Sequence, residues 1–169
     1  MTVENEELDL KAASRIARRV DLKSIHLLSI DASCDATSIE MRPLTPSFDH
    51  SCEPLKSGQA GIIEVACNYT FKVKASETNV ADAKMTYRII YTLNGDEPTE
   101  ESDIRHFARA NGAYHSWPFA RETIFGLTSR MGFPPYTLPV LSFHPKPKPK
   151  PAATETVATK PANTSPPSE

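Results

Sequence analysis

The 169-residue chain has few cysteines and no long hydrophobic run, and both features limit the kind of protein it can be. Cys34, Cys52 and Cys67 are odd in number and lack paired spacing, which predicts reduced thiols. No apolar stretch approaches the length of a membrane span, and the acidic start MTVENEELDL is unlike a secretory signal peptide. We therefore expect a cytoplasmic protein that does not insert into a membrane.

The sequence also lacks the motifs by which common enzyme classes are recognised. It contains no glycine-rich phosphate loop, no nucleophile elbow and no helix with paired histidines. His50 and Cys52 could join Cys34 or Cys67 around a metal ion, but none of them has the spacing of a ligand set. We expect neither catalysis nor a metal or other cofactor.

The C-terminal residues 145–169 differ in composition from the rest of the chain. They contain seven prolines and no aromatic residue, so they cannot build a core, and we predict a disordered tail. The tail carries four lysines against two glutamates, a net charge of +2. Because the whole chain carries −2, the remaining residues carry −4, which gives no support for nucleic-acid binding.

The first third of the chain predicts a helix, a strand and a long loop. Apolar residues recur with helical spacing in Glu6 to Val20, so we assign residues 1–20 to an N-terminal helical extension of one domain at 21–144. Asp21 to Cys34 reads as a strand, with Leu28, Ile30, Ala32 and Cys34 on one side. Residues 35–60 contain three prolines and no sustained period, which indicates a long crossover loop.

Two further segments, GIIEVACNYTFKVKA and KMTYRIIYTL, alternate strictly between apolar and polar residues. A period of two over this length predicts strands with one apolar face and one wetter face. The link between them, SETNVADA, is short, so we expect an antiparallel hairpin.

The chain then becomes helical. Thr99 can cap a helix from Glu100 to Asn111 that stops at Gly112. A second helix starts at Pro118, which suits the first turn, and ends at Gly132. The following FPPYTLPVLSF cannot be a helix interior or a central strand, so we expect it to pack as an extended piece over the body.

The second of these helices has apolar residues on more than one side. Ile124 and Leu127 belong to one stripe, whereas Phe119 and Phe125 lie on opposite flanks of it. If exposed, each phenylalanine would forgo roughly 1.5–3 kcal/mol of burial. Either neighbouring loops or a second subunit must cover these two rings.

The stretch WPFARETIFGLTSRMGFPPYTLPVLSF resembles the SecB family of protein-export chaperones. The corresponding region of that family has a proline-aromatic-Ala-Arg-Glu helix start, then Ser-Arg, Gly and Phe-Pro, and an apolar stretch ending in Phe. Here these features are Pro118 to Glu122, Ser129 with Arg130, Phe133 with Pro134, and Phe143. The preceding GAY fits as well.

The resemblance implies an α+β fold, a four-stranded antiparallel sheet packed with helices, that assembles as a dimer of dimers. The helix headed by Pro118 would lie at subunit contacts, so we expect Ile124, Phe125 and Leu127 at the oligomer interface. The family has no active site. Its members are ATP-independent holdases that keep preproteins unfolded in apolar grooves and deliver them to the SecA motor.

A holdase groove needs large, adaptable side chains with few geometric demands. Core or subunit contact is the alternative role for each candidate. Our candidates for the client-binding groove are Tyr87, Tyr91, Trp117, Phe119, Phe133 and Tyr136. From the family's acidic docking surface for SecA, only Asp31 has a counterpart in this sequence.

The sequence departs from the family after Phe143, where HPKPKPKP replaces the closing amphipathic helix. The N-terminal helix and the run DEPTEE look more like the SecB-like chaperones that guard antitoxins in toxin–antitoxin–chaperone modules. The client can therefore be a preprotein or a dedicated antitoxin. Two rivals from other classes remain: a module that binds a small ligand between sheet and helix, and a passive adaptor acting through the tail.

Overall fold

The computed structural model describes residues 7–35, 37, 43–56, 61–95 and 97–143, so the predicted tail lies outside the described residues. The elements in chain order are α1 (Leu10–Ala17), β1 (Val20–Cys34), β2 (Leu44–Lys56), β3 (Ile62–Ala75), β4 (Thr78–Leu93), α2 (Glu101–Phe107), the π-helical turn η3 (Ala108–Gly112) and α3 (Ala113–Arg130). Among the described residues, no helix is both long enough and apolar enough to cross a membrane.

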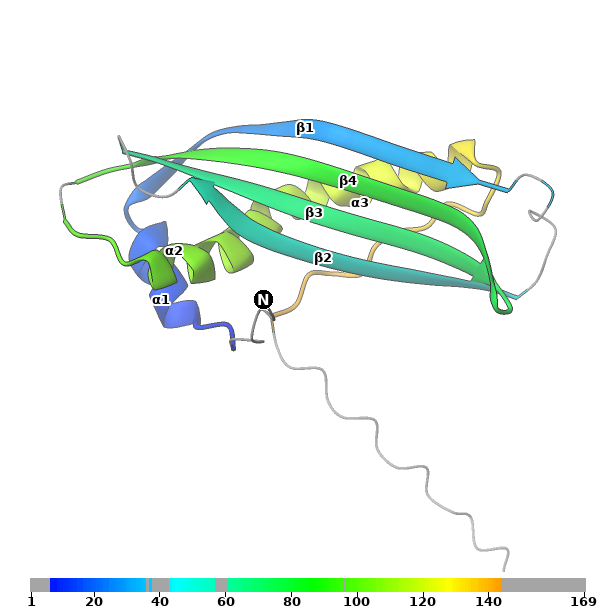
Figure 1. The fold of residues 1–169 in the computed structure, drawn as a ribbon, viewed down its shortest axis with the longest axis horizontal. Coiled ribbons are helices and arrows are strands. Elements are labelled where there is room, and N and C mark those ends of the chain that lie inside the picture. Colours follow the sequence, from blue (N-terminus) through cyan, green and yellow to red (C-terminus); the bar gives the residue numbers. More distant parts are fainter. Residues whose placement is uncertain (1–6, 36, 38–42, 57–60, 96, 144–169) are drawn as a thin grey trace, which may run out of the picture.

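The four strands form one antiparallel sheet in the order β1-β4-β3-β2 (Figure 1). The β3–β4 hairpin is antiparallel as predicted, with Ile63 opposite Tyr91 and Tyr69 opposite Met85. This sheet and its helices confirm the α+β class expected from the sequence.

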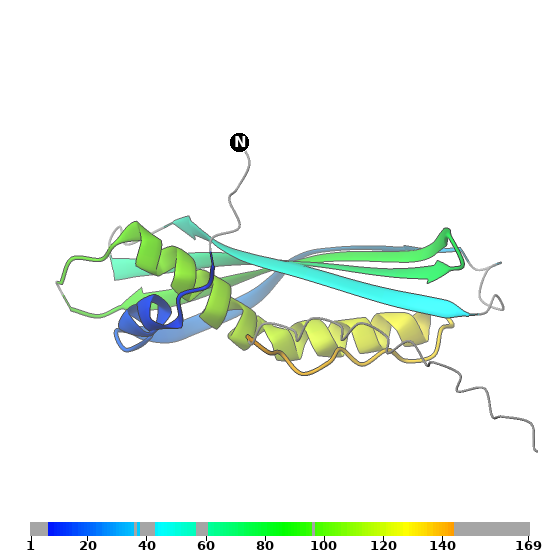
Figure 2. The ribbon, with the colours of Figure 1, turned by 90° about the horizontal axis from the view of Figure 1, so that it is seen from below.

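The helices cover one face of the sheet. Helix α3 and the extended segment 133–143 run along that face, while α1 and α2 pack together near one end of the sheet (Figure 2). The alternation of β3 and β4 follows from this arrangement, because their odd-numbered apolar residues from Ile63 to Tyr91 face the helices and are buried. The largest side chains of this core include Tyr69, Phe71, Ile89 and Phe107.

The prediction of a long loop over residues 35–60 was wrong, because this region contains the 13-residue strand β2. Its alternate residues Pro46, Phe48, His50 and Pro54 pair with the buried face of β3. Two prolines and a histidine at inward positions hide the period of two. The strand tolerates these prolines because it lies at the edge of the sheet, where one side needs no hydrogen-bond ladder.

The predicted break between two C-terminal helices was also wrong. Gly112 has a right-handed φ of −58°, and the chain passes through η3 directly into α3. Pro118 lies inside α3 rather than at its start. The side chains of Pro118 and Tyr114 are exposed, so water can reach the backbone where the proline removes a helical hydrogen bond.

The role of Gly112 is close approach to the sheet. A Cβ atom there would lie 2.9 Å from Val65 Cγ1 and 3.0 Å from Cys67 Sγ. We expect Gly112→Ala to lower the free energy of unfolding by about 1–3 kcal/mol through overpacking. The measurement is urea unfolding followed by circular dichroism.

A matched control is available in the same helix. At Gly126 an added Cβ would meet only the flexible guanidinium of Arg130, at 2.9 Å. Gly126→Ala should therefore be neutral or stabilising by up to about 1 kcal/mol, since alanine favours helix. Equal losses from Gly112→Ala and Gly126→Ala would contradict the close-approach argument.

The end of α3 and the segment after it match the sequence prediction. Gly132 has φ of +82°, and residues 133–143 form neither helix nor strand. The segment is tied to α3 by hydrogen bonds from the Phe133 amide to the Thr128 carbonyl and from the Tyr136 amide to Thr128 Oγ1. Leu138 is completely buried, so this extended piece helps to close the core.

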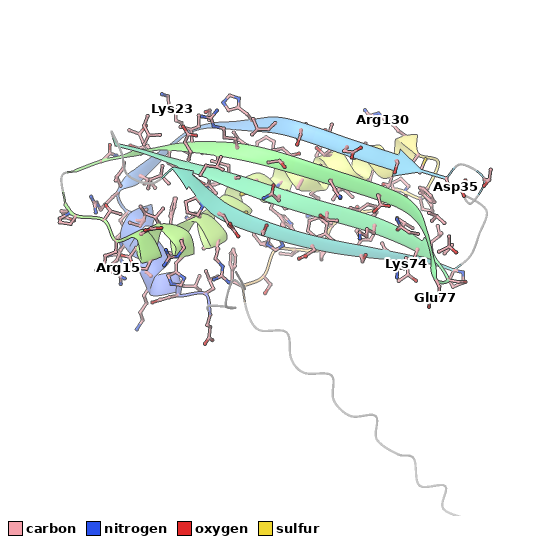
Figure 3. The ribbon with its side chains drawn as sticks, viewed as in Figure 1. Arg15, Lys23, Asp35, Lys74, Glu77 and Arg130 are labelled. Carbon is pink, nitrogen blue, oxygen red and sulfur yellow. The ribbon has the colours of Figure 1, made fainter. Side chains whose placement is uncertain are left out.

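Helix α1 is shorter than predicted and is fixed to α2. The Asp9 side chain caps α1, and Arg15 makes two hydrogen bonds to Asp103 of α2, at 2.7 and 2.5 Å. These bonds hold the pKa of the Asp103 carboxyl below its ordinary value. Thr99 does not cap α2, because the N-cap residue is Glu100. Figure 3 shows Arg15 at this end of the molecule and Lys74 and Glu77 at the opposite, hairpin end.

Candidate functional site

At its β1 edge, the sheet face that packs against the helices is exposed to solvent. On β1, Leu22, Leu27 and Ile30 pair with Tyr91, Tyr87 and Met85 of β4, so they share the face that the helices cover. Yet these three β1 side chains are 45%, 47% and 44% exposed, while their β4 partners are buried. An apolar face of β1 is thus open to solvent.

The cause is the position of α3. This helix packs mainly against β2, β3 and β4, and the segment 133–143 lies on its far side from β1. Phe119 of α3 is 46% exposed, and its ring centroid lies 6.4 Å from that of Tyr87. We call Leu22, Leu27, Ile30 and Phe119 the β1–α3 strip.

Tyr87 is a buried residue between Leu27 of β1 and Phe119 of α3. Its hydroxyl makes a hydrogen bond of 2.8 Å with Thr123 Oγ1 of α3. Burial raises the pKa of the Tyr87 hydroxyl, so it stays neutral near pH 7. Tyr87 therefore adds no charge next to the strip, and its hydroxyl is already hydrogen-bonded to α3.

The opposite flank of α3 is closed by aromatic packing. Trp117 lies edge-on against Phe48 and His50 of β2, with ring centroids 5.4 Å apart in each case. The Trp117 indole N–H donates a hydrogen bond of 3.1 Å to the Pro139 carbonyl. This flank is therefore filled by the chain itself, and Trp117 is buried.

The six residues predicted to line the groove do not come together at one open surface. Tyr87, Tyr91, Trp117 and Phe133 are buried. The Tyr91 hydroxyl lies 2.9 Å from His115 Nδ1, within a region whose burial raises the tyrosine pKa and lowers the histidine pKa.

Only two of the six predicted groove residues reach the surface. Tyr136 is half-buried, and its ring centroid lies 5.2 Å from that of Phe71. Phe119 is largely exposed and belongs to the β1–α3 strip. Of the six, Phe119 therefore contributes to the exposed strip, and Tyr87 lies next to it in the core.

The three residues predicted for the oligomer interface occupy different environments. Ile124 is completely buried in the core and Leu127 is half-buried. Phe125 is 48% exposed. It lines a shallow pocket of about 340 Å³, together with Trp117, Pro118, Arg121, Glu122 and Thr137. Within one chain, Phe125 is thus the member of the three with most surface to offer a partner.

Asp31, the predicted SecA-docking residue, lies on β1 and is exposed. Its cross-strand neighbour is Lys84 of β4. The two side chains have opposite charges on adjacent strands, so this part of the sheet is mixed in charge rather than acidic.

The sequence did not reveal the β1–α3 strip, because β1 is irregular. Its pairing with β4 shifts between Leu22 and Ser24 and again between Leu27 and Ser29. Each shift inserts one residue, so an unbroken alternation groups Leu28 with Leu22 and Ile30 but leaves out Leu27. The sequence signal that could have indicated an apolar surface on β1 was its number of leucine and isoleucine residues.

Cysteine and histidine side chains do not gather into a metal-binding group within the described part of the chain. No group of three or more His, Cys, Asp or Glu residues has suitable geometry there. Cys34 is exposed on β1, whereas Cys52 and Cys67 are buried on β2 and β3.

The chain is similar in sequence to two curated proteins. No family model matches the sequence. The SecB-like chaperones MT2006 and Rv1957, from Mycobacterium tuberculosis strains CDC 1551 / Oshkosh and ATCC 25618 / H37Rv, are each 26% identical over 159 residues, covering 81% of this chain and 86% of the relative.

A solved structure shares the fold. It is the Mycobacterium tuberculosis Rv1957 SecB-like chaperone in complex with a ChAD peptide from the Rv1956 HigA1 antitoxin. The TM-score is 0.69 at 21% identity, covering 78% of this chain and 96% of that chain. Together these comparisons confirm the resemblance to SecB-like chaperones that the sequence indicates.

Proposed function

We propose that this chain, which is similar to SecB-like chaperones, is an ATP-independent holdase that binds unfolded segments of client proteins. The observation that carries the proposal is the β1–α3 strip, a row of exposed apolar side chains on the face of the sheet that a globular protein normally buries. Exposing Leu22, Leu27, Ile30 and Phe119 costs stability, and binding an apolar segment recovers it.

The shape of the strip suits an extended chain. Leu22 and Ile30 are eight residues apart on β1, which corresponds to roughly 25 Å of strand. A client segment of about seven or eight extended residues matches this length. Apolar contact selects side chains loosely, so affinity would grow with the number of segments bound at once.

For the client we favour an antitoxin over a preprotein. The curated relatives are named SecB-like chaperones, and the similar solved chain is bound to an antitoxin peptide. Export through SecA is the second candidate. It has less support, because the neighbour of Asp31 across the strands is the oppositely charged Lys84.

We also propose that the chain assembles, as the family resemblance implies, into a homotetramer built as a dimer of dimers. Among the described residues, no strand pairs with the outer edge of β1 or of β2. Strand β2 carries Pro46 and Pro54, which block added pairing, whereas the 15 residues of β1 include no proline. The β1 edge is therefore the better place for a second copy.

The test of the proposed function is suppression of aggregation. A chemically unfolded client is diluted into buffer with the purified full chain, and light scattering follows aggregation with and without ATP. Suppression that does not depend on ATP is the expected result. Unchanged aggregation together with a monomeric mass would favour the small-ligand module instead.

Phe125 provides a test of assembly. If this exposed ring is covered by another copy, Phe125→Asp should split the oligomer, because a carboxylate cannot be buried there without a partner. Multi-angle light scattering measures the mass. Phe125→Leu, which keeps an apolar side chain, should retain the wild-type mass. An unchanged mass for Phe125→Asp would remove Phe125 from the interface.

A further inference from the structure

Two of the three cysteines lie directly opposite each other in the sheet. Cys52 of β2 and Cys67 of β3 are cross-strand partners in the antiparallel register, and both side chains point to the buried face. Cys34 lies on β1, at the other edge of the sheet, and is exposed. The client-holding role proposed above makes no use of the buried pair.

The helical layer packs directly against this cysteine pair at Gly112. Gly112 approaches so near that an added Cβ would lie 3.0 Å from Cys67 Sγ and 3.3 Å from Cys52 Cβ. One turn further on, Ser116 Oγ donates a hydrogen bond of 2.6 Å to the Gly112 carbonyl and lies 2.6 Å from the Tyr69 hydroxyl.

The backbone geometry already matches that of a disulfide. Directly opposed residues in an antiparallel pair have Cα atoms about 4.5 or 5.5 Å apart, depending on the type of pair. Disulfides span Cα separations of about 4.4–6.8 Å. Cys52 and Cys67 are paired in register and both are buried on the same face of the sheet, so their side chains lie next to each other. Bond formation thus requires side-chain rotation but no displacement of the strands.

We propose that Cys52 and Cys67 are a modification site, at which a hydroperoxide converts the buried dithiol into a reversible intramolecular disulfide. The Cys67 sulfur attacks the O–O bond of the hydroperoxide, which releases an alcohol, or water from hydrogen peroxide, and leaves a sulfenic acid. The Cys52 sulfur then attacks Cys67 Sγ and displaces water. Two thiols and one hydroperoxide thus give one disulfide, one alcohol and one water.

The order of the two sulfurs follows from the interaction between the paired thiols. Their mutual interaction lowers the pKa of the Cys67 thiol and raises the pKa of the Cys52 thiol. Cys67 therefore supplies the first thiolate, and Cys52 acts as the resolving thiol. The oxidant reaches the pair when the edge strand β2 opens, since β2 is hydrogen-bonded to the sheet on one side only.

The disulfide would fasten the edge strand β2 to β3. It closes the connection 53–66, which removes freedom from the unfolded chain. We expect the Tm of the oxidised protein to rise by about 5–10 °C relative to the reduced protein.

The experiment uses the full chain carrying Cys34→Ser, so that the exposed thiol cannot form intermolecular bridges. The protein is treated with hydrogen peroxide, denatured and alkylated with iodoacetamide. We expect both remaining thiols to be protected, an intact mass lower by about 2 Da, and full reversal by dithiothreitol. Peptide mapping should recover Cys52 linked to Cys67, and the reduced protein should show the lower Tm.

Two control variants separate the disulfide from other oxidation. With Cys52→Ala added, the same treatment should leave Cys67 as a sulfenic or sulfinic acid and give no rise in Tm. With Cys67→Ala added, Cys52 should remain alkylatable, because the first nucleophile is gone. Two alkylatable thiols after oxidation of the Cys34→Ser protein, or a mass gain without a crosslink, would overturn the proposal.

Discussion

Replacing Leu27 and Ile30 together with aspartate is expected to remove most client holding while leaving the fold intact. Both side chains are exposed on the β1–α3 strip, so charge there costs little in the free chain. In a complex the same carboxylates would be buried against an apolar client without partners. Losing two apolar contacts of roughly 1.5–3 kcal/mol each weakens binding by at least about 100-fold.

The measurement is client affinity by fluorescence anisotropy, supported by aggregation kinetics and circular dichroism. The matched control is Ser24→Asp with Ser29→Asp, which adds the same charge to the same strand. Ser24 and Ser29 pair with Ile90 and Thr86, on the face of the sheet opposite helix α3 (Figure 2). The control should hold clients nearly as well as the wild type. Equal loss in both double variants would show that charge alone, and not the strip, is responsible.

The same double variant distinguishes client binding from self-assembly. If the strip is instead covered by a second copy, Leu27→Asp with Ile30→Asp would lower the mass of the oligomer. Loss of client affinity at unchanged mass assigns the strip to clients. Loss of mass at unchanged affinity assigns it to the subunit interface, and the proposed client site is then wrong.

The central part of the sheet could be predicted because local pattern and burial agree there. In β3 and β4, residues such as Val65, Phe71 and Ile89 alternate with polar residues, and the structure buries the inward apolar positions from Ile63 to Tyr91. Strands flanked by strands on both sides have one consistent environment for each face. Under these conditions a period of two directly reports the fold.

The edge strands could not be predicted so well, because their environment is less uniform. In β2, the inward positions include Pro46, His50 and Pro54, which an edge accepts and a central strand does not. In β1, two shifts in register break the alternation. Both irregularities depend on which strand lies at the edge, and that is decided by tertiary pairing.

The residues predicted for the groove differ from those that form the exposed strip, apart from Phe119. Large aromatic residues were expected to line a groove, yet aromatic size also favours burial, and the chain uses Tyr91, Trp117 and Phe133 for its own core. Phe119 was identified correctly as an off-stripe ring, since it is exposed as the helical pattern indicates. The aliphatic half of the strip depends on α3 leaving β1 uncovered, which local sequence does not report.

Trp117 and Phe119 are two residues apart on α3 and should give opposite results when replaced with alanine. Trp117 packs against Phe48, His50 and Tyr69, and its indole N–H bonds to Pro139, so it joins α3, β2 and the segment 133–143.

Trp117→Ala should lower the free energy of unfolding by about 3–5 kcal/mol, as expected for loss of a buried tryptophan. The Pro139 carbonyl would also lose its donor. Phe119→Ala removes a ring that is already 46% exposed, so the loss should stay below about 1.5 kcal/mol, while client affinity falls about 10-fold.

Urea unfolding and client anisotropy on both variants separate the two roles. If Trp117→Ala is as stable as the wild type yet loses client affinity, the indole contacts clients directly and the closed flank of α3 must open during binding. If Phe119→Ala retains full affinity, the client does not lie between β1 and α3. If Trp117→Ala loses stability and Phe119→Ala loses client affinity, the client binds on the β1 side of α3. Trp117 then has a structural role, packing α3 against β2 and the segment 133–143.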